Sequence, residues 1–214
     1  MRLGGMTAIL FFIHFAQLLF ATPLHQAILE GDLPSVQYLL SSRKADVNEF
    51  SESTTPLILA TENNQATIVE LLLRQGADPN LRELSFNETA LFKASFKGFP
   101  GIAQLLISYG ADVRLRIKND ETCLMWASFK GFSDISRMLV IAGADVNAQD
   151  TKYGFSPLMV AAKNGHSATV ELLLGSGANP HLLDKAGRSA LVHAQSKGNA
   201  QVVALLTDIL RQEL

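Results

Sequence analysis

The feature that most constrains this 214-residue chain is a repeat of 33 or 34 residues. Six short motifs begin at a threonine or serine, and each has leucine two residues later, alanine five residues later and leucine again seventeen residues later. The six starting residues are Thr22, Thr55, Thr89, Thr122, Ser156 and Ser189. Because three positions are kept in all six copies, the sequence predicts an array of similar structural units.

Within each unit, the residue types predict two short helices. Threonine and serine are favoured N-caps, and proline follows in three copies, at the first helical position where its missing N–H costs nothing. Nine residues after the cap lies glycine, or Asn64 in one copy, which suits the left-handed conformation that ends a helix. A second helix carries apolar residues at helical spacing, such as Val69, Leu72 and Leu73, and ends at a Gly-Ala-Asp type of turn. A loop of about ten residues then leads to the next cap.

A unit of this size cannot bury both helices by itself, so the units are expected to stack into an all-α solenoid. Several stretches resemble the ankyrin repeat, namely Thr22-Pro-Leu-His-Gln-Ala, Gly165-His166, Val170-Glu-Leu-Leu-Leu174 and Gly143-Ala-Asp-Val-Asn147. The resemblance implies a helix–turn–helix solenoid with hairpin loops, forming one domain over residues 22–214 after an apolar N-terminal segment, residues 1–21. In the first copy, Lys44 is expected in place of the loop glycine.

The sequence gives no sign of catalysis or of a bound cofactor. It lacks a phosphate-binding loop and the common hydrolase motifs, and its histidines form no metal-ligand pair at helical spacing. We therefore predict no catalytic residues, no metal, no cofactor and no enzymatic activity. The resemblance implies structural hydrogen bonds for His25 and His166. Cys123, the single cysteine, is predicted to be a buried small side chain rather than a reactive thiol.

Function is expected on the exposed face of the first helices. Positions four, seven and eight after each cap lie roughly opposite the core side of the helix, and they vary between copies. In ankyrin-like arrays this face, with the hairpin tips, forms the concave groove that holds partners. His193 is placed on this exposed face. The predicted partner-binding residues are Lys93, Phe96, Lys97, Trp126, Phe129, Lys130 and Lys163 on the helices, and Phe86, Tyr153 and Phe155 at the tips.

Aromatic anchors with a charged rim are typical of protein-binding hot spots, so the sequence predicts an adaptor that binds another protein. The expected partner is an acidic segment with an apolar anchor, held by repeats three to five, while Glu30 and Glu62 make the opposite end of the groove acidic. In the alternative interpretation, Phe96 and Phe129 pack sideways on neighbouring helices and the lysines contact only solvent. The net charge of −2 argues against a nucleic-acid partner. The alternative function is a membrane-associated or secretory-pathway scaffold without a groove ligand.

The N-terminal segment leaves the cellular location open. Residues 6–21 are strongly apolar and fit a signal peptide, a membrane anchor or a helix that caps the first repeat. The terminal Arg211-Gln-Glu-Leu214 resembles an endoplasmic-reticulum retrieval signal, and Asn87-Glu-Thr89 is a glycosylation sequon. Ankyrin-like arrays, however, mostly work in the cytosol or nucleus, and a single cysteine suits a reducing compartment.

Overall fold

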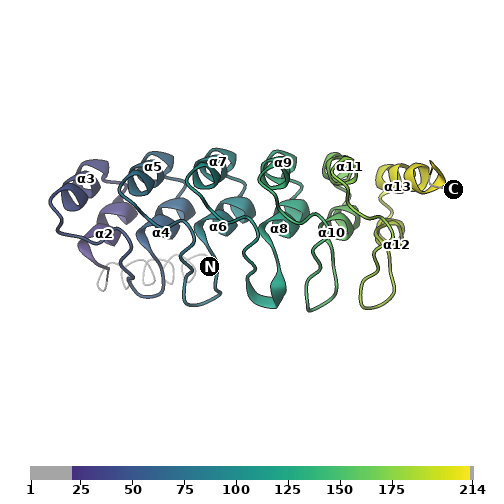
Figure 1. Cartoon of the computed structure of the whole chain (residues 1–214), viewed down its shortest axis with the longest axis horizontal. Helices are drawn as coiled ribbons and strands as arrows, with labels where there is room; N and C mark the ends of the chain where they lie inside the picture. Colours follow the sequence, from purple (N-terminus) through teal and green to yellow (C-terminus); the bar gives the residue numbers. More distant parts are fainter. Residues whose placement is uncertain (1–20, 213–214) are drawn as a thin grey trace, which may run out of the picture.

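The computed structural model describes residues 21–212, in which twelve α-helices form six pairs, one pair for each repeat (Figure 1). The first helices of the pairs are α2 (Pro23–Glu30), α4 (Pro56–Glu62), α6 (Ala90–Lys97), α8 (Cys123–Lys130), α10 (Pro157–Asn164) and α12 (Ala190–Lys197). The second helices are α3 (Leu33–Ser41), α5 (Ala66–Arg74), α7 (Pro100–Ser108), α9 (Ser133–Ile141), α11 (Ser167–Gly175) and α13 (Ala200–Gln212). A short 3-10 helix, η1 (Lys118–Asp120), lies in the hairpin before α8. The predicted all-α solenoid is confirmed.

The residues predicted to begin and end the first helices do so. Each cap side chain accepts a hydrogen bond from the backbone N–H three residues later, as Thr122 does from Met125. The residue nine positions after the cap has a left-handed backbone, with φ of 74° at Gly131 and 55° at Asn64. Gly131 also has a steric reason to be glycine, because a Cβ atom there would lie 2.5 Å from Nδ1 of His166.

The prediction that Lys44 replaces the loop glycine of the first repeat is wrong. Arg43 takes that place, with φ of 53°, and its N–H donates to the Leu40 carbonyl just as the Gly76 N–H donates to the Leu73 carbonyl. Ala45 is then one extra residue before the conserved turn. The insertion lies between the end of the helix and the turn. Counting back from the Ala-Asp-Val-Asn sequence therefore puts Lys44 in the place of the glycine, whereas the backbone conformation puts Arg43 there.

The repeated alanine and leucine positions build a continuous core between two layers of helices (Figure 1). The first helices form one layer and the second helices the other, and each helix packs on its equivalents in the neighbouring repeats. The alanine five residues after each cap is fully or almost fully buried in every repeat. Its small side chain lets adjacent first helices approach closely. The buried alanines are Ala27, Ala60, Ala94, Ala127, Ala161 and Ala194.

The hairpins project from the first-helix layer and are linked to one another by asparagine side chains (Figure 1). Asn147, for example, donates from Nδ2 to the Gly177 carbonyl and accepts at Oδ1 from the Asn179 N–H. Asn48 and Asn80 make the same pair of bonds to the next repeat. These bonds fix the spacing of the hairpins along the surface described next.

Candidate functional site

The first-helix face of repeats three and four carries a row of aromatic rings in contact with one another, here called the aromatic ladder. It consists of Phe92 and Phe96 on α6, and Trp126 and Phe129 on α8. The ring centroids of Phe96 and Trp126 are 5.1 Å apart, and those of Trp126 and Phe129 are 5.5 Å apart, both edge to face. Phe92 is buried in the core, whereas Phe129 is 41% exposed. The ladder therefore extends from the core to the surface. Phe96 and Trp126 pack against each other between neighbouring helices, and Phe129 is exposed enough to contact a partner.

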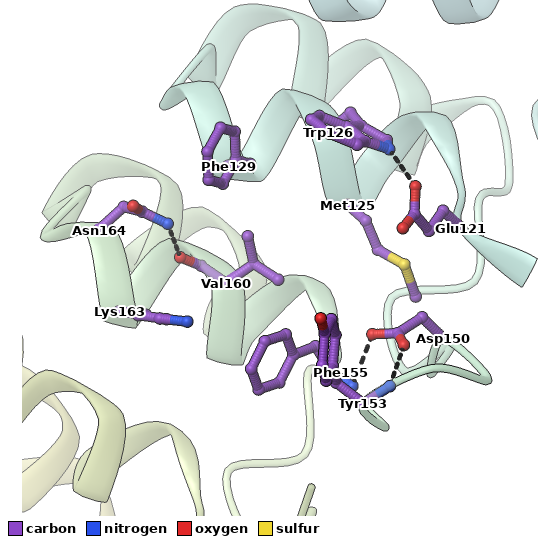
Figure 2. A pocket seen from close by; sticks show the side chains of 10 residues that line it. All are labelled: Glu121, Met125, Trp126, Phe129, Asp150, Tyr153, Phe155, Val160, Lys163 and Asn164. Atoms are coloured by element: carbon purple, nitrogen blue, oxygen red, sulfur yellow. Dashed lines mark hydrogen bonds between the residues drawn. The ribbon is translucent and has the colours of Figure 1, made fainter. Parts of the chain in front are cut away.

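A pocket of about 220 Å³ opens beside the exposed end of the ladder (Figure 2). It lies between α8, α10 and the hairpin that joins repeats four and five. Trp126 and Phe129 form one wall, and Tyr153 and Phe155 form another, with Val160 between them (Figure 2). The remaining lining residues are Glu121, Met125, Asp150, Lys163 and Asn164.

Two carboxylates that sequence reasoning missed shape this pocket. Glu121 Oε2 accepts a hydrogen bond of 2.9 Å from the Trp126 indole N–H, which fixes the orientation of the ring. Asp150 accepts from the backbone N–H groups of Tyr153 and Phe155, at 2.6 and 2.8 Å, and so closes the hairpin. An aspartate followed by a turn glycine is a known signature of such side-chain-closed turns, so Asp150 could have been found from sequence. No sequence signal placed Glu121 beside the indole.

Two of the predicted lysines lie over aromatic rings of the site, and a third, Lys97, bonds to a backbone oxygen. The Lys130 Nζ lies 4.6 Å from the centre of the Phe96 ring and 5.7 Å from that of Phe129, and the Lys163 Nζ lies 4.8 Å from that of Phe155. The Lys97 Nζ donates to the Glu62 carbonyl oxygen. Within residues 21–212, none of these three ammonium groups forms an ion pair with a carboxylate.

Lys93 differs from the other lysines, and its predicted place in the exposed row is wrong. Its side chain is only 13% exposed, and its Nζ lies 2.8 Å from Glu62 and 2.5 Å from Glu88, with Glu83 at 3.8 Å. Burial opposes the charged ammonium, but the hydrogen bonds to Glu62 and Glu88 raise the pKa of Lys93 above its ordinary value. Glu83 and Glu88 come from the preceding hairpin, whose path over α6 the sequence pattern does not reveal.

His193 was also expected on the exposed face, and this is wrong because the last hairpin covers it. It is 3% exposed, and its Nε2 donates to Asp184 Oδ2 at 2.9 Å. Burial lowers the pKa of His193, which keeps the imidazole neutral. Although burial works against ionisation of Asp184, hydrogen bonds from Arg188 and His193 lower the pKa of Asp184 to about 2.

The structural roles predicted for the other singled-out residues are confirmed. The His25 ring bonds to the Thr22 hydroxyl at 2.9 Å and to the Thr54 carbonyl at 3.3 Å, while His166 bonds to the Phe129 carbonyl at 2.9 Å. Cys123 is buried, and this burial raises the pKa of its thiol to about 12. In the described part of the chain, no group of three histidine, cysteine or acidic residues has a metal-binding arrangement. Nor does any helix there have the length and apolar character to cross a membrane.

The structure brings together only part of the predicted set. Trp126, Phe129, Tyr153, Phe155 and Lys163 line one pocket, and Phe96 and Lys130 adjoin it through the aromatic ladder. Phe86 is 59% exposed, but it lies on a different hairpin, as Lys97 lies on a different helix. The predictions made for residues 6–20 and for the last two residues fall outside the described range.

Stacked helix pairs joined by ordered hairpins define a helical-repeat solenoid. The chain belongs to the ankyrin repeat family, since the family model described as ankyrin repeats (3 copies) matches residues 7–83, 57–150 and 151–213. Ankyrin repeats are generally modules that bind other proteins.

Individual relatives agree with this assignment. A B-cell lymphoma 3 protein homolog of Mus musculus is 34% identical over 86% of this chain, and an ankyrin repeat protein nuc-2 of Neurospora crassa is 28% identical over 90%. The chain spans only 43% and 15% of their respective lengths. Among solved structures, an ankyrin repeat domain of Acinetobacter baumannii is 30% identical with a TM-score of 0.81, covering 86% of this chain and 96% of that one. The Bcl-3 ankyrin domain is 31% identical with a TM-score of 0.80, covering 88% and 86%.

Proposed function

We propose that this protein is a non-enzymatic adaptor that holds an acidic segment of a partner protein against the first-helix face of repeats three to five. The observation that carries the proposal is the pocket beside the aromatic ladder, because it combines an apolar wall with lysines that lack carboxylate partners. An apolar side chain of the partner would fill the pocket, and acidic neighbours would face Lys130 and Lys163. The similarity to Bcl-3, a member of the IkappaB protein family, supports a role in protein binding.

Phe129 and its aromatic neighbours would supply most of the binding energy. Large aromatic side chains at the centre of an interface, surrounded by polar groups that exclude water, supply most of the binding energy in typical complexes. Phe129 and Tyr153 are 41% and 51% exposed, so covering them with a partner removes apolar surface from water. Trp126 contributes a rigid wall, since its indole N–H is already held by Glu121.

The two halves of the first-helix face differ in charge. Lys97, Lys130, Lys163 and Lys197 form a row at the C-terminal ends of α6, α8, α10 and α12. In the first half of the array, three glutamates surround the single charge of Lys93 and leave an excess of negative charge. An acidic segment is therefore attracted to the row of lysines and repelled from the acidic cluster at the junction of repeats two and three.

The test compares the variant Trp126→Ala/Phe129→Ala with the wild type in a pull-down, followed by affinity measurements on the captured protein. We expect the variant to stay folded with a lower melting temperature, because Trp126 packs on Phe96, and to lose about 2 kcal/mol or more of binding free energy at a temperature where both proteins are folded. The control is Ile141→Ala, because Ile141 is 80% exposed at the end of a second helix. If melting of the double variant collapses, the rings belong to the core and the proposal is wrong. If the captured protein binds equally well, the scaffold without a groove ligand is the better description.

A further inference from the structure

The pocket between α8 and α10 has two chemically different ends (Figure 2). The carboxylates of Glu121 and Asp150 lie at the hairpin end, on either side of the Met125 side chain (Figure 2). Lys163 and Asn164 lie at the opposite end, on the last turn of α10. The aromatic walls run between these ends. A side chain that enters the pocket therefore meets apolar surface along its length and hydrogen-bond acceptors at the hairpin end.

Those acceptors are only partly used. A carboxylate offers about four lone-pair positions on its two oxygens. Glu121 receives one hydrogen bond, from the Trp126 indole, and Asp150 receives one at each oxygen, from Tyr153 and Phe155. Each carboxylate therefore keeps acceptor capacity. A purely apolar ligand would displace water from these acceptors without replacing its hydrogen bonds, which costs affinity.

The surrounding charges and rings disfavour two other kinds of ligand. An acidic side chain at the hairpin end would face two carboxylates and be repelled. A cationic side chain would find the ring faces beside the pocket already used, because Lys163 lies 4.8 Å from the Phe155 ring centre and Lys130 lies 5.7 Å from that of Phe129. Glu121 and Asp150 would attract a cation at the hairpin end, but Lys130 and Lys163 would repel it along the aromatic walls, so the net gain is smaller than for a neutral donor.

A neutral aromatic side chain with a hydrogen-bond donor satisfies all of these conditions. Resting on the proposed function, we propose that the anchor of the acidic partner segment is a tyrosine or tryptophan whose O–H or N–H donates to Glu121. The ring would contact Trp126, Phe129 and Phe155, and the acidic residues beside it in the partner would face Lys163 and Lys130. Glu121 is then the residue that selects the anchor.

The experiment uses the full chain and a set of fluorescein-labelled peptides, Asp-Glu-Gly-X-Gly-Asp-Glu, in which X is tyrosine, phenylalanine, leucine or arginine. Fluorescence anisotropy measures affinity. Emission from Trp126, the only tryptophan of the chain, reports whether the peptide occupies the pocket. We expect the tyrosine peptide to bind about tenfold more tightly than the phenylalanine peptide, because a hydrogen bond to a carboxylate distinguishes them.

The variant Glu121→Met removes the acceptor and keeps a similar side-chain length. Because the variant also releases the Trp126 indole, we expect it to weaken both peptides and to bring the affinity ratio of the tyrosine and phenylalanine peptides from about ten to about one. Glu171→Met is the matched control, because Glu171 is exposed on α11, in the other helix layer, and should leave both affinities unchanged.

The results separate this inference from the proposed function. Equal binding of the tyrosine, phenylalanine and leucine peptides, with a change in Trp126 emission, would leave the acidic-segment function standing and overturn the selection by Glu121. Tightest binding of the arginine peptide would also overturn it. A tyrosine preference that persists in Glu121→Met would show that the donor has another acceptor. If no peptide binds or changes Trp126 emission, both proposals are wrong.

Discussion

At the scale of single residues, Lys93 shows how a charge on a helix surface can be given a structural role. Its ammonium lies among Glu62, Glu83 and Glu88, which come from α4 and from the hairpin that precedes α6. Burial raises the pKa of Glu83, which marks the carboxylate least well solvated in this cluster. The lysine therefore holds two repeats and a hairpin together.

We expect Lys93→Met to lower the free energy of unfolding by about 2–4 kcal/mol, because it leaves three carboxylates close together without their cation. Lys130→Met should change it by less than about 0.5 kcal/mol, since Lys130 is exposed and only contacts aromatic rings. Urea denaturation of both variants provides the measurement. Equal losses of unfolding free energy in the two variants would show that the ion pairs of Lys93 do not stabilise the fold. Acidification should reduce the Lys93→Met loss as the carboxylates become protonated.

Two buried histidines predict how stability depends on pH. Burial lowers the pKa of both His25 and His193, although Glu49 and Asp184 partly oppose the shift. The unfolded chain therefore binds protons at a higher pH than the folded protein, so stability is full above the unfolded pKa of about 6.5 and falls below it. We expect the variant His25→Gln/His193→Gln to lose less stability than the wild type between about pH 7.5 and about pH 5.5. Urea denaturation measures the free energy of unfolding at each pH. If the wild type and the variant lose equal amounts of it, the loss comes from groups that both proteins share, such as the Glu83 carboxyl, and the prediction is wrong.

At the scale of elements, the hairpins are held in register by asparagines, and one link differs. Asn48, Asn80 and Asn147 each bridge to the following repeat through a donor and an acceptor. In the third repeat Arg114 occupies the equivalent position, and its backbone N–H makes the same bond to Asp112 that Asn147 makes to Asp145. A guanidinium has no acceptor for the N–H of the next repeat. The hairpins of repeats three and four are joined instead by the Thr151 N–H, which donates to the Asn119 carbonyl at 2.8 Å, and by Arg116, which donates to the Gln149 carbonyl.

The variant Arg114→Asn should complete the series of asparagine bridges. Because the backbone already has the required turn, we expect a gain of about 1 kcal/mol in the free energy of unfolding from the added hydrogen bonds. Arg114→Ala is the matched control and should leave stability nearly unchanged, as the Arg114 side chain is exposed. The midpoints of urea unfolding measure both changes. Identical midpoints for the two variants would show that the bridge adds nothing at this junction.

At the scale of the whole molecule, the extensive helix contacts within residues 21–212 join neighbouring repeats, so stability is a sum of repeats and interfaces rather than the property of one central core. Leu139 in the fourth repeat and Leu206 in the sixth are both completely buried. The first has neighbours on both sides among the described repeats, whereas the second lies in the last helix (Figure 1). Equivalent substitutions at these two positions should therefore have different consequences.

We expect Leu139→Ala to cost about 2–5 kcal/mol and to shift unfolding monitored both by circular dichroism and by Trp126 fluorescence. Leu206→Ala should lower the onset of the circular-dichroism transition and leave the Trp126 transition nearly in place, because the last repeat opens first. If both variants shift both probes equally, the six repeats unfold as one cooperative unit and the nearest-neighbour description is wrong.

The sequence was most informative where one residue type meets one local requirement. Cap threonines, left-handed glycines and the buried alanines recur with the repeat, so the helix bounds and the core could be predicted residue by residue. The residues of the candidate site were harder to predict from the sequence. Lys93 and His193 have the same helical offset as Trp126, yet hairpins cover the first two and leave the indole at a pocket. A helical wheel describes one helix and contains no information about the loop that packs over it.

The sequence by itself thus determined the fold. Each unit cannot bury its own helices, and all six units bury them against their neighbours through the same residue positions. Only the tertiary structure decided which exposed positions form a site. The pocket needs Trp126 from one helix, Val160 from the next and Tyr153 from the hairpin between them. Its chemistry also depends on Glu121, whose carboxylate reaches the indole only once the hairpin is in place. Contacts of this kind depend on the path of the loops, for which the repeat sets no pattern.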